Sequence, residues 1–482
     1  MPTAIAAAIA TATAIGTFLG FVGTVATIVG AVVVIGTVAL ATKAMKRKQM
    51  AGQSSISGTL ISKSGSSASV PVIYGERRVA GHRTFVASNG AKNANLHIVE
   101  TLCEGQIEGV TEIYFNDELA GTSSDNGATW DFASYSYSGV VTAEVYDGSQ
   151  TTASSSLVGE GVGWVSTSVG NGVAYVYLKL VWDEDKFGSG LPNVTYKVKG
   201  KKVPAIGAAW DSTLTYSTNP IRILQDYFLN PVYGKGVPNT LIDAASFNAA
   251  VSYCDEQVNA SSSDATQVTR YTTNAYLDTT VDVLTNFETL LTACRAGLIT
   301  GDKYRMLVDR PTTPLTVKVN DDNIVGDITF LQANKKTLLN SIRTTFPNKA
   351  GDFNYQEDIS IVDSATLQGA AYDGVKLQAD MELEHTTDAD GVERISTEEI
   401  NQSRQSGIVE VTVDPSMIDL TVGDVIKFSN ATLGQTDKLY RIISTIVRSD
   451  HTIVLNMREY DSNVYWDNNT SVIVNNKDDT DH

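Results

Sequence analysis

The chain has 482 residues, of which 42% are hydrophobic and 19% are charged. At about 100–200 residues per domain this length predicts about three folded units, and the hydrophobic content is sufficient for real cores, which excludes a disordered chain. The formal net charge of −18 argues against a protein that coats nucleic acid through a basic surface. The three cysteines, Cys103, Cys254 and Cys294, form no CxxC or Cys/His pairing, which excludes a zinc module and a disulfide scaffold.

The N-terminal segment combines a long apolar run with a basic collar. Residues 1–42 contain no Asp, Glu, Lys, Arg or His. About 20 apolar residues span a bilayer as a helix, so the run is long enough for one long helix or a helical hairpin. The residues expected to form a membrane or channel segment are Phe18, Leu19, Gly20, Phe21, Gly23, Ile28, Val29, Gly30, Val33 and Ile35. The basic collar consists of Lys43, Lys46, Arg47 and Lys48.

Three interpretations of this apolar run remain open. A cleaved signal peptide requires a basic region before a short apolar core, whereas here the basic residues follow a longer run. A membrane-penetrating segment fits the length. A helix pair buried against a partner protein fits the abundance of Ala, Thr and Gly, which allow close packing. The last two are compatible if the segment is stored in one state and acts in another.

The remainder is predicted to be mainly β with α segments. We expect an apolar segment with its collar over 1–50, a Ser/Gly-rich linker over 51–69, a first β domain over 70–205 with a polar β insertion near 121–170, a helical segment over 206–305, a second β domain over 306–405, a C-terminal β-barrel over 406–470 and a polar tail over 471–482.

Alternating apolar residues predict strands in the N-terminal half. In the segment 173–182 (VAYVYLKLVW), Tyr175 and Tyr177 alternate with Val176 and Leu178. This period of two is typical of a half-buried strand.

Helices are predicted from apolar residues three and four apart. Asn219 can cap a helix whose first turn accepts Pro220, and this helix ends before Pro231. Further helices are expected over 243–257, 280–297 and near 335–344. The C-terminal segments GIVEVTV, DVIKFS, KLYRIISTIVR and HTIVLNMREY predict four strands of a compact antiparallel module.

The sequence offers no catalytic set. The five histidines form no HExxH pair, and GxSxG and GxxxxGK[ST] motifs are absent. A calcium site and a solvated turn are the two interpretations of the acidic run Asp183–Asp185, and the absence of EF-hand spacing favours the turn. Cys254 and Cys294 fall on apolar helix faces, which favours core positions over nucleophiles. We therefore predict a protein that is not an enzyme and that has no cofactor and no metal site.

Three segments carry a resemblance to one family. They are VPVIYGERRVAG (70–81), NPIRILQDYFLNPVYGKGVPNTLIDAASFNAAVSYCDE (219–256) and LYRIISTIVRSDHTIVLNMREYDSNVYW (439–466). In this order they resemble the central tail hub proteins, or tip attachment protein J group, of long-tailed phages. The motif residues, expected to be structural, are Tyr74, Gly75, Asn219, Pro220, Pro231, Tyr233, Gly234, Gly236, Pro238, Asp243, Arg458, Glu459 and Tyr460.

The resemblance implies a virion protein of the tail tip with tube-like antiparallel β-barrel hub domains. Such hubs are homotrimers that close the distal end of the tail tube and open for DNA ejection. The implied partners are further copies of the chain, the distal tail protein, the C-terminus of the tape measure protein, tail fibre or tip proteins, and genomic DNA in transit without sequence-specific binding.

The chain is expected to depart from larger family members by lacking the long C-terminal receptor-binding extension. Receptor recognition is therefore expected of a separate fibre or tip protein. The apolar run makes us expect that residues 3–42 plug the channel or enter the host membrane, with the collar at anionic head groups. The alternatives are a membrane-anchored β-rich adhesin or receptor-binding protein, and a carbohydrate- or peptidoglycan-cleaving tip enzyme, for which no paired acidic site is evident.

Overall fold

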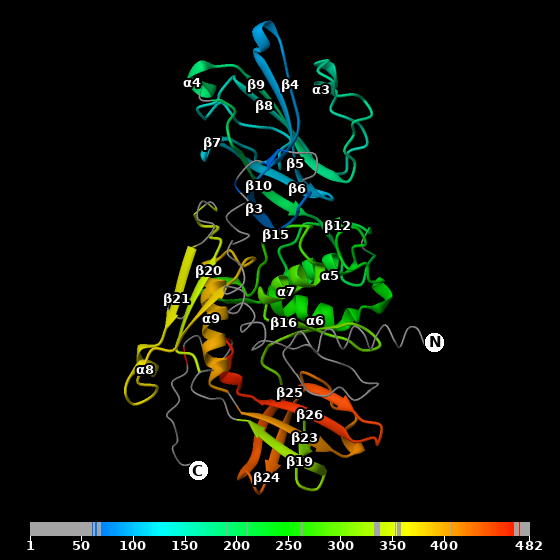
Figure 1. Cartoon of the computed structure of the whole chain (residues 1–482), viewed down its shortest axis with the longest axis vertical. Coiled ribbons are helices and arrows are strands. Elements are labelled where there is room, and N and C mark those ends of the chain that lie inside the picture. Colours follow the sequence, from blue (N-terminus) through cyan, green and yellow to red (C-terminus); the bar gives the residue numbers. More distant parts are fainter. Residues whose placement is uncertain are drawn as a thin grey trace.

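The computed structural model describes residues 69–466 except 189, 210, 262–263, 332–337, 352, 354–357 and 406, and in addition residues 60, 63, 64 and 472. The apolar segment from Phe18 to Ile35, the collar from Lys43 to Lys48, and most of the predicted linker and polar tail lie outside the described residues. The described chain is elongated: an N-terminal β region lies at one end of the long axis, a C-terminal sheet at the other, and helices between them (Figure 1).

The N-terminal β region consists of two facing sheets that enclose one core. The first sheet has the order β1-β4-β5-β9-β8, with β1 (Lys63–Ser64), β4 (His82–Asn89), β5 (Asn95–Glu104), β9 (Val173–Val181) and β8 (Val141–Tyr146). The second has the order β3-β10-β6-β7, with β3 (Glu76–Ala80), β10 (Val194–Lys201), β6 (Ile107–Phe115) and β7 (Glu118–Thr122). Short helices η1 (Ala91–Asn93), α3 (Ser155–Gly159) and α4 (Glu184–Phe187) lie in the connections. Val176 of the first sheet and Tyr196 of the second belong to the shared core.

Strand β9 is buried on both faces, which corrects the expectation of a half-buried strand. Val176 faces the core between the sheets, while Tyr175 and Tyr177 pack on the other face with Leu157 and Trp164. The residues that cover this outer face come from the stretch rich in Ser, Thr and Gly, in which isolated apolar side chains gave no periodic signal.

The central region contains three helices and several short strand pairs. The helices are α5 (Pro220–Leu229), α6 (Ala244–Asp255) and α7 (Val283–Thr292), with the 3₁₀ turn η2 (Asn239–Leu241) between the first two. The antiparallel pairs are β2 (Val72–Tyr74) with β15 (Ala275–Leu277), β11 (Val203–Pro204) with β12 (Leu214–Thr215), β13 (Gln257–Asn259) with β14 (Gln267–Thr269), and β16 (Ala296–Ile299) with β17 (Arg305–Val308). All three helices were predicted from sequence, and Asn219, Asp243 and Asp282 cap them by accepting backbone N–H groups.

A three-stranded sheet and a long helix complete the central region. The sheet has the order β21-β20-β22, with β20 (Ser341–Phe346), β21 (Asp358–Asp363) and β22 (Gln378–Glu382), and α8 (Ala365–Gln368) follows β21. Helix α9 (Ala389–Ser403) packs against β20 and β21, and its Val392 and Ile395 share one core with α5, α6 and α7.

The helix expected near 335–344 is wrong for residues 341–344, because Ile342 lies on β20, in the middle of this sheet. Pairing with a neighbouring strand on each side overrides the local helical spacing. Helix α9 itself was not predicted, since it carries few apolar residues.

The C-terminal sheet curls into a half-barrel. Its order is β18-β24-β25-β26-β23-β19, with β18 (Lys318–Val319), β19 (Ile324–Leu331), β23 (Ile408–Val413), β24 (Val425–Asn430), β25 (Gln435–Val447) and β26 (Ile453–Glu459). The turns η3 (Pro415–Met417) and η4 (Ser462–Val464) flank it. The four predicted strands are present as β23–β26, and their neighbours pair antiparallel. The outermost strands β18 and β19 are consecutive in the chain, so the two edges meet at one turn. The prediction of a mainly β fold with α segments is confirmed.

Candidate functional site

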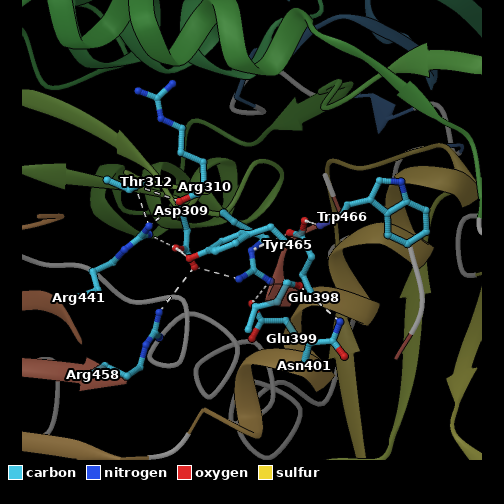
Figure 2. A network of polar contacts seen from close by, with 12 residues as sticks. Asp309, Arg310, Thr312, Glu398, Glu399, Asn401, Arg441, Arg458, Tyr465 and Trp466 are labelled. Atoms are coloured by element: carbon cyan, nitrogen blue, oxygen red, sulfur yellow. Dashed lines mark hydrogen bonds and ion pairs between the residues drawn. The ribbon is translucent and has the colours of Figure 1, made fainter. Parts of the chain in front are cut away.

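A buried network of charged and polar side chains lies where the central region meets the half-barrel (Figure 2). Its side chains come from the segment between β14 and β15, from the residue directly before β16, from the segment that follows β17, from α9, from β25 and β26, and from the turn that follows β26. The members of this ionic network are Tyr271, Arg295, Asp309, Arg310, Thr312, Glu398, Glu399, Asn401, Arg441, Arg458, Tyr465 and Trp466.

Asp309 lies at the centre of the ionic network, directly after β17. Its carboxylate contacts Nη2 of Arg295 at 3.0 Å and Nη2 of Arg458 at 3.8 Å, and it also pairs with Arg441. The hydroxyl of Tyr465 donates to Oδ1 at 2.7 Å. Burial alone would raise the pKa of Asp309, but the charges of the three arginines hold this pKa well below its ordinary value. The carboxylate is therefore ionised at neutral pH.

Two adjacent carboxylates of α9 contact one guanidinium. Arg295 reaches Glu398 from Nε at 3.2 Å and Glu399 from Nη1 at 2.9 Å. Tyr271 donates from its hydroxyl to Glu398 at 3.1 Å. Burial raises the pKa of Glu399 to about 7, against the opposing effect of Arg295. Burial thus brings the pKa of Glu399 close to neutral pH, and burial raises the pKa of the neighbouring Glu398 as well.

The turn after β26 returns to α9 and closes the ionic network. The backbone N–H of Trp466 donates to Oε1 of Glu398 at 2.9 Å, and its indole N–H donates to the carbonyl of Asn259 at 3.1 Å. The side-chain amide of Asn401 donates to the carbonyl of Val464. Arg394 lies over the indole ring, 5.5 Å from its centroid. Backbone and side-chain groups of the turn therefore fix it to α9.

The arrangement of charges suits a structural joint better than a reactive centre. The three carboxylates at its centre are each engaged by an arginine of the protein itself. In the described part of the chain, no group of three or more His, Cys, Asp or Glu side chains is arranged to hold a metal ion. Among the same residues, no helix has both the length and the apolar character needed to cross a membrane.

A second buried network joins two of the motif segments. Tyr74 of β2 and Tyr233, which follows α5, both donate to Oδ2 of Asp226, Tyr233 at 2.9 Å. Lys201 Nζ contacts both oxygens of the same carboxylate at 2.9 Å. The side chains from the first and second motif segments thus meet on one aspartate, which had not been singled out in the sequence.

The other motif residues of the central region occupy turns and helix ends. Gly75 and Gly236 adopt positive φ angles of 64° and 68°, which glycine tolerates without strain. Asn219 and Asp243 are N-caps. A Cβ atom at Gly234 would overlap the carbonyl oxygen of Tyr227. The remaining motif prolines are Pro220 in the first turn of α5, Pro231 directly after it and Pro238 directly before η2.

The third motif segment contributes to the half-barrel and to the ionic network. Arg458 contacts Asp309, as described above. Glu459 pairs with Lys438 on the neighbouring strand at 3.0 Å. The hydroxyl of Tyr460 donates to the carbonyl of Thr312 at 3.1 Å, which ties the segment before β18 to the end of β26.

Most of the ionic network was missed by sequence analysis. Arg295, Asp309 and Glu399 were not singled out, because each partner lies far away in the chain. A usable signal existed at Arg441, a charged residue inside the otherwise apolar strand KLYRIISTIVR. A buried charge at such a position requires a partner.

Comparisons with known proteins agree on one group. A family model described as "Putative phage tail protein" matches residues 284–445, a range that includes Arg295, Asp309, Glu398, Glu399 and Arg441. Tip attachment protein J of Escherichia phage SECphi27 is 25% identical over an alignment of 193 residues, and the match covers 37% of this chain and 16% of that protein. A chain of the native gene transfer agent particle aligns with 96% of this chain and 98% of its own length, at a TM-score of 0.56 and 18% identity.

These findings support the interpretation of the chain as a phage tail-tip protein. They equally support a location in the virion tail, and the resemblance expected from the sequence is confirmed. At 18% identity the likeness to the gene transfer agent chain establishes a shared fold. The 43 kDa tail protein of prophage MuSo2 from Shewanella oneidensis is 11% identical and aligns with 81% of this chain and 99% of its own chain, at a TM-score of 0.30. The match to the phage SECphi27 protein spans about a sixth of that protein's length.

Proposed function

We propose that three copies of this tail protein form a ring that closes the distal end of the tail tube and opens for DNA ejection. The observation that carries the proposal is the likeness in fold to a chain of the gene transfer agent virion, which extends over 96% of this chain. A likeness of this extent favours a subunit used as a whole, and the family match to a phage tail protein supports the same role.

A structural role is favoured by what the buried polar side chains do. The ionic network and the Asp226 network join segments distant in the chain, and the motif residues shape turns and caps. Catalytic groups, in contrast, need access to a substrate. The described carboxylates of the ionic network are nearly inaccessible to solvent, since Glu398 and Asp309 have exposed fractions of 0% and 3%.

The net charge suits a passage for DNA. With a formal charge of −18 per chain, a ring of three copies repels the phosphate backbone, so that DNA passes without being retained. Contacts to the distal tail protein, to the C-terminus of the tape measure protein and to fibre or tip proteins would hold such a ring in place.

The apolar residues 3–42 are expected to be buried. At ~25 cal/mol per Å² of apolar surface removed from water, burial of this segment would be favourable by tens of kcal/mol of free energy per copy. Under the proposal they plug the channel before infection or enter the host membrane during it. The collar of Lys43, Lys46, Arg47 and Lys48 would then lie at anionic head groups.

Imaging of purified particles tests the ring. An antibody fragment against an epitope tag at the C-terminus is expected to mark three positions around a bore at the distal end of the tail. A lone subunit, a dimer without a bore, or a label elsewhere on the particle would contradict the proposal. Stable fractionation of the chain with membranes in cells without particles would instead favour the anchored adhesin.

Deletion of residues 3–42 tests the role of the apolar segment. Assembly, adsorption and DNA entry are measured separately on the same particles. We expect normal adsorption with impaired assembly if the segment is a plug, or with impaired DNA entry if it penetrates the membrane. Normal values for all three would refute both roles while leaving the ring untouched.

A further inference from the structure

The half-barrel has a core of its own. Its buried side chains include Val409, Val411, Ile426, Phe428 and Leu455, each with an exposed fraction of 0%. Within the described residues, only Ile299 and Leu307 of the β16–β17 hairpin join this core from the central region. Apolar contact between the two regions is therefore small.

Charged side chains also meet at the junction, and they are divided between the two regions. On the central side, Arg295 faces Asp309, Glu398 and Glu399, one positive against three negative charges, a formal −2. On the half-barrel side, Arg441 and Arg458 give a formal +2. The two surfaces are thus complementary in charge.

The free-energy cost of opening a junction of charged side chains differs from that of opening an apolar junction. Separation of apolar surfaces costs free energy in proportion to the area exposed to water. Buried charges lose hydration when the junction closes and regain it when the junction opens, so an ion network gives one defined orientation with a small net stabilisation.

We propose that the ionic network is a releasable joint, at which the half-barrel separates from the central region as a folded unit. The contacts that break are those of Asp309 with Arg441, Arg458 and Tyr465. The contacts of α9 to Val464 and Trp466 break with them, as does the hydrogen bond from the Trp466 indole to the carbonyl of Asn259. The described chain crosses the junction at residues 309–315, and in the chain α9, which ends at Ser403, is followed by β23 of the half-barrel, which begins at Ile408.

The segment 309–315 moves with the half-barrel beyond Asp309. Thr312 donates its backbone N–H to the hydroxyl of Tyr460 at 2.8 Å, and Leu315 donates to the carbonyl of Val425 at 2.7 Å. The bending point therefore lies between Asp309 and Thr312. This joint is a property of one chain and stands whether or not three copies form a ring.

Hydrogen exchange of the full chain, followed by mass spectrometry, tests the joint. The variant Asp309→Asn removes the central charge, and Arg458→Gln is a second variant that removes one of the two cations on the half-barrel side. The reporter is the peptide that contains residues 464–466, because the N–H of Trp466 is bound to Glu398 across the junction. Amides of β24 and β25 report on the core of the half-barrel.

Both variants are expected to increase exchange at 464–466 about tenfold or more, the effect of weakening the junction by about 1.4 kcal/mol, with β24 and β25 unchanged. The matched control is Asp226→Asn, which removes another buried, lysine-paired carboxylate of the central region and should leave 464–466 unchanged. Faster amide exchange in β24 and β25 as well as at 464–466 would overturn the proposal, because the two regions would then form one cooperative unit. Unchanged exchange at 464–466 in both variants would overturn it as well.

Discussion

The hydroxyl oxygens of Tyr74 and Tyr233 lie 3.4 Å apart, although 159 residues separate them in the chain. Both donate to the same oxygen of Asp226. Tyr74 ends β2, and Tyr233 follows the helix that carries Asp226. The shared carboxylate therefore joins the first motif segment to the second, and burial together with the charge of Asp226 raises the pKa of both phenols.

Removal of these hydroxyls is predicted to be non-additive. Tyr74→Phe and Tyr233→Phe should each lower the free energy of unfolding by about 1 kcal/mol, because one neutral donor to a charged acceptor is lost while the other remains. The double variant should lose at least about 0.5 kcal/mol more than the sum, since Asp226 then retains Lys201 alone. Urea unfolding of the four proteins measures this coupling. Additivity within about 0.3 kcal/mol would show that the two bonds are independent.

Gly234 is predicted to tolerate no side chain. A Cβ atom there would overlap the carbonyl oxygen of Tyr227, whereas a Cβ at Gly159 would meet nothing within 4 Å. Gly234→Ala should therefore cost about 3 kcal/mol or more in unfolding free energy, because backbone has to shift, and Gly159→Ala should stay within about 0.5 kcal/mol of the parent. Equal thermal unfolding midpoints for the two variants would contradict this account of the turn.

Local signals were sufficient to predict helices α5, α6 and α7 of the central region and strands β23 to β26 of the half-barrel. Asn219 with Pro220 defined the start of α5, and its apolar spacing defined the buried face. The alternation in KLYRIISTIVR predicted β25. In these segments the local preference of the chain and its tertiary environment agree, which is why a pattern of a few residues was enough.

The ionic network lay beyond such signals for a physical reason. Arg295 and Glu399 are paired at 2.9 Å, but each is an ordinary polar residue in its own segment. Helix α9 was missed for the same reason, because its buried face includes Arg394, Glu398 and Glu399. Burial of these side chains depends on partners supplied by distant strands, and no periodicity along one segment encodes those partners.

The segment 154–164, which covers the outer face of β9, is predicted to be a locally stable unit. Leu157 of α3 is fully buried against Tyr175 and Tyr177. Leu157→Ala should destabilise this cover by about 2–4 kcal/mol through the cavity it leaves. Because the core on the other face of β9 is separate, amides of residues 154–164 should exchange faster while those of β10 keep their protection. Equal acceleration in β10 would contradict a separate unit.

The final prediction concerns Glu399 and pH. Its pKa is about 7 in the folded chain against an ordinary value of 4.5, so between these values the folded chain holds a proton that the unfolded chain has released. Stability contributed by this group therefore falls as pH rises from 4.5 to 7, by up to about 3 kcal/mol at 1.4 kcal/mol per unit. Asp309, whose pKa is lowered, contributes stability that is lost only in more acidic solution. Burial lowers the pKa of His97. This shift makes stability rise with pH, in the opposite sense to Glu399, but it is common to parent and variant.

Urea unfolding of the parent and of Glu399→Gln at pH 5 and pH 8 isolates the contribution of Glu399 to the pH dependence of stability. The variant should gain about 2 kcal/mol on the parent between the two pH values, and a constant difference would show that Glu399 does not titrate in this range.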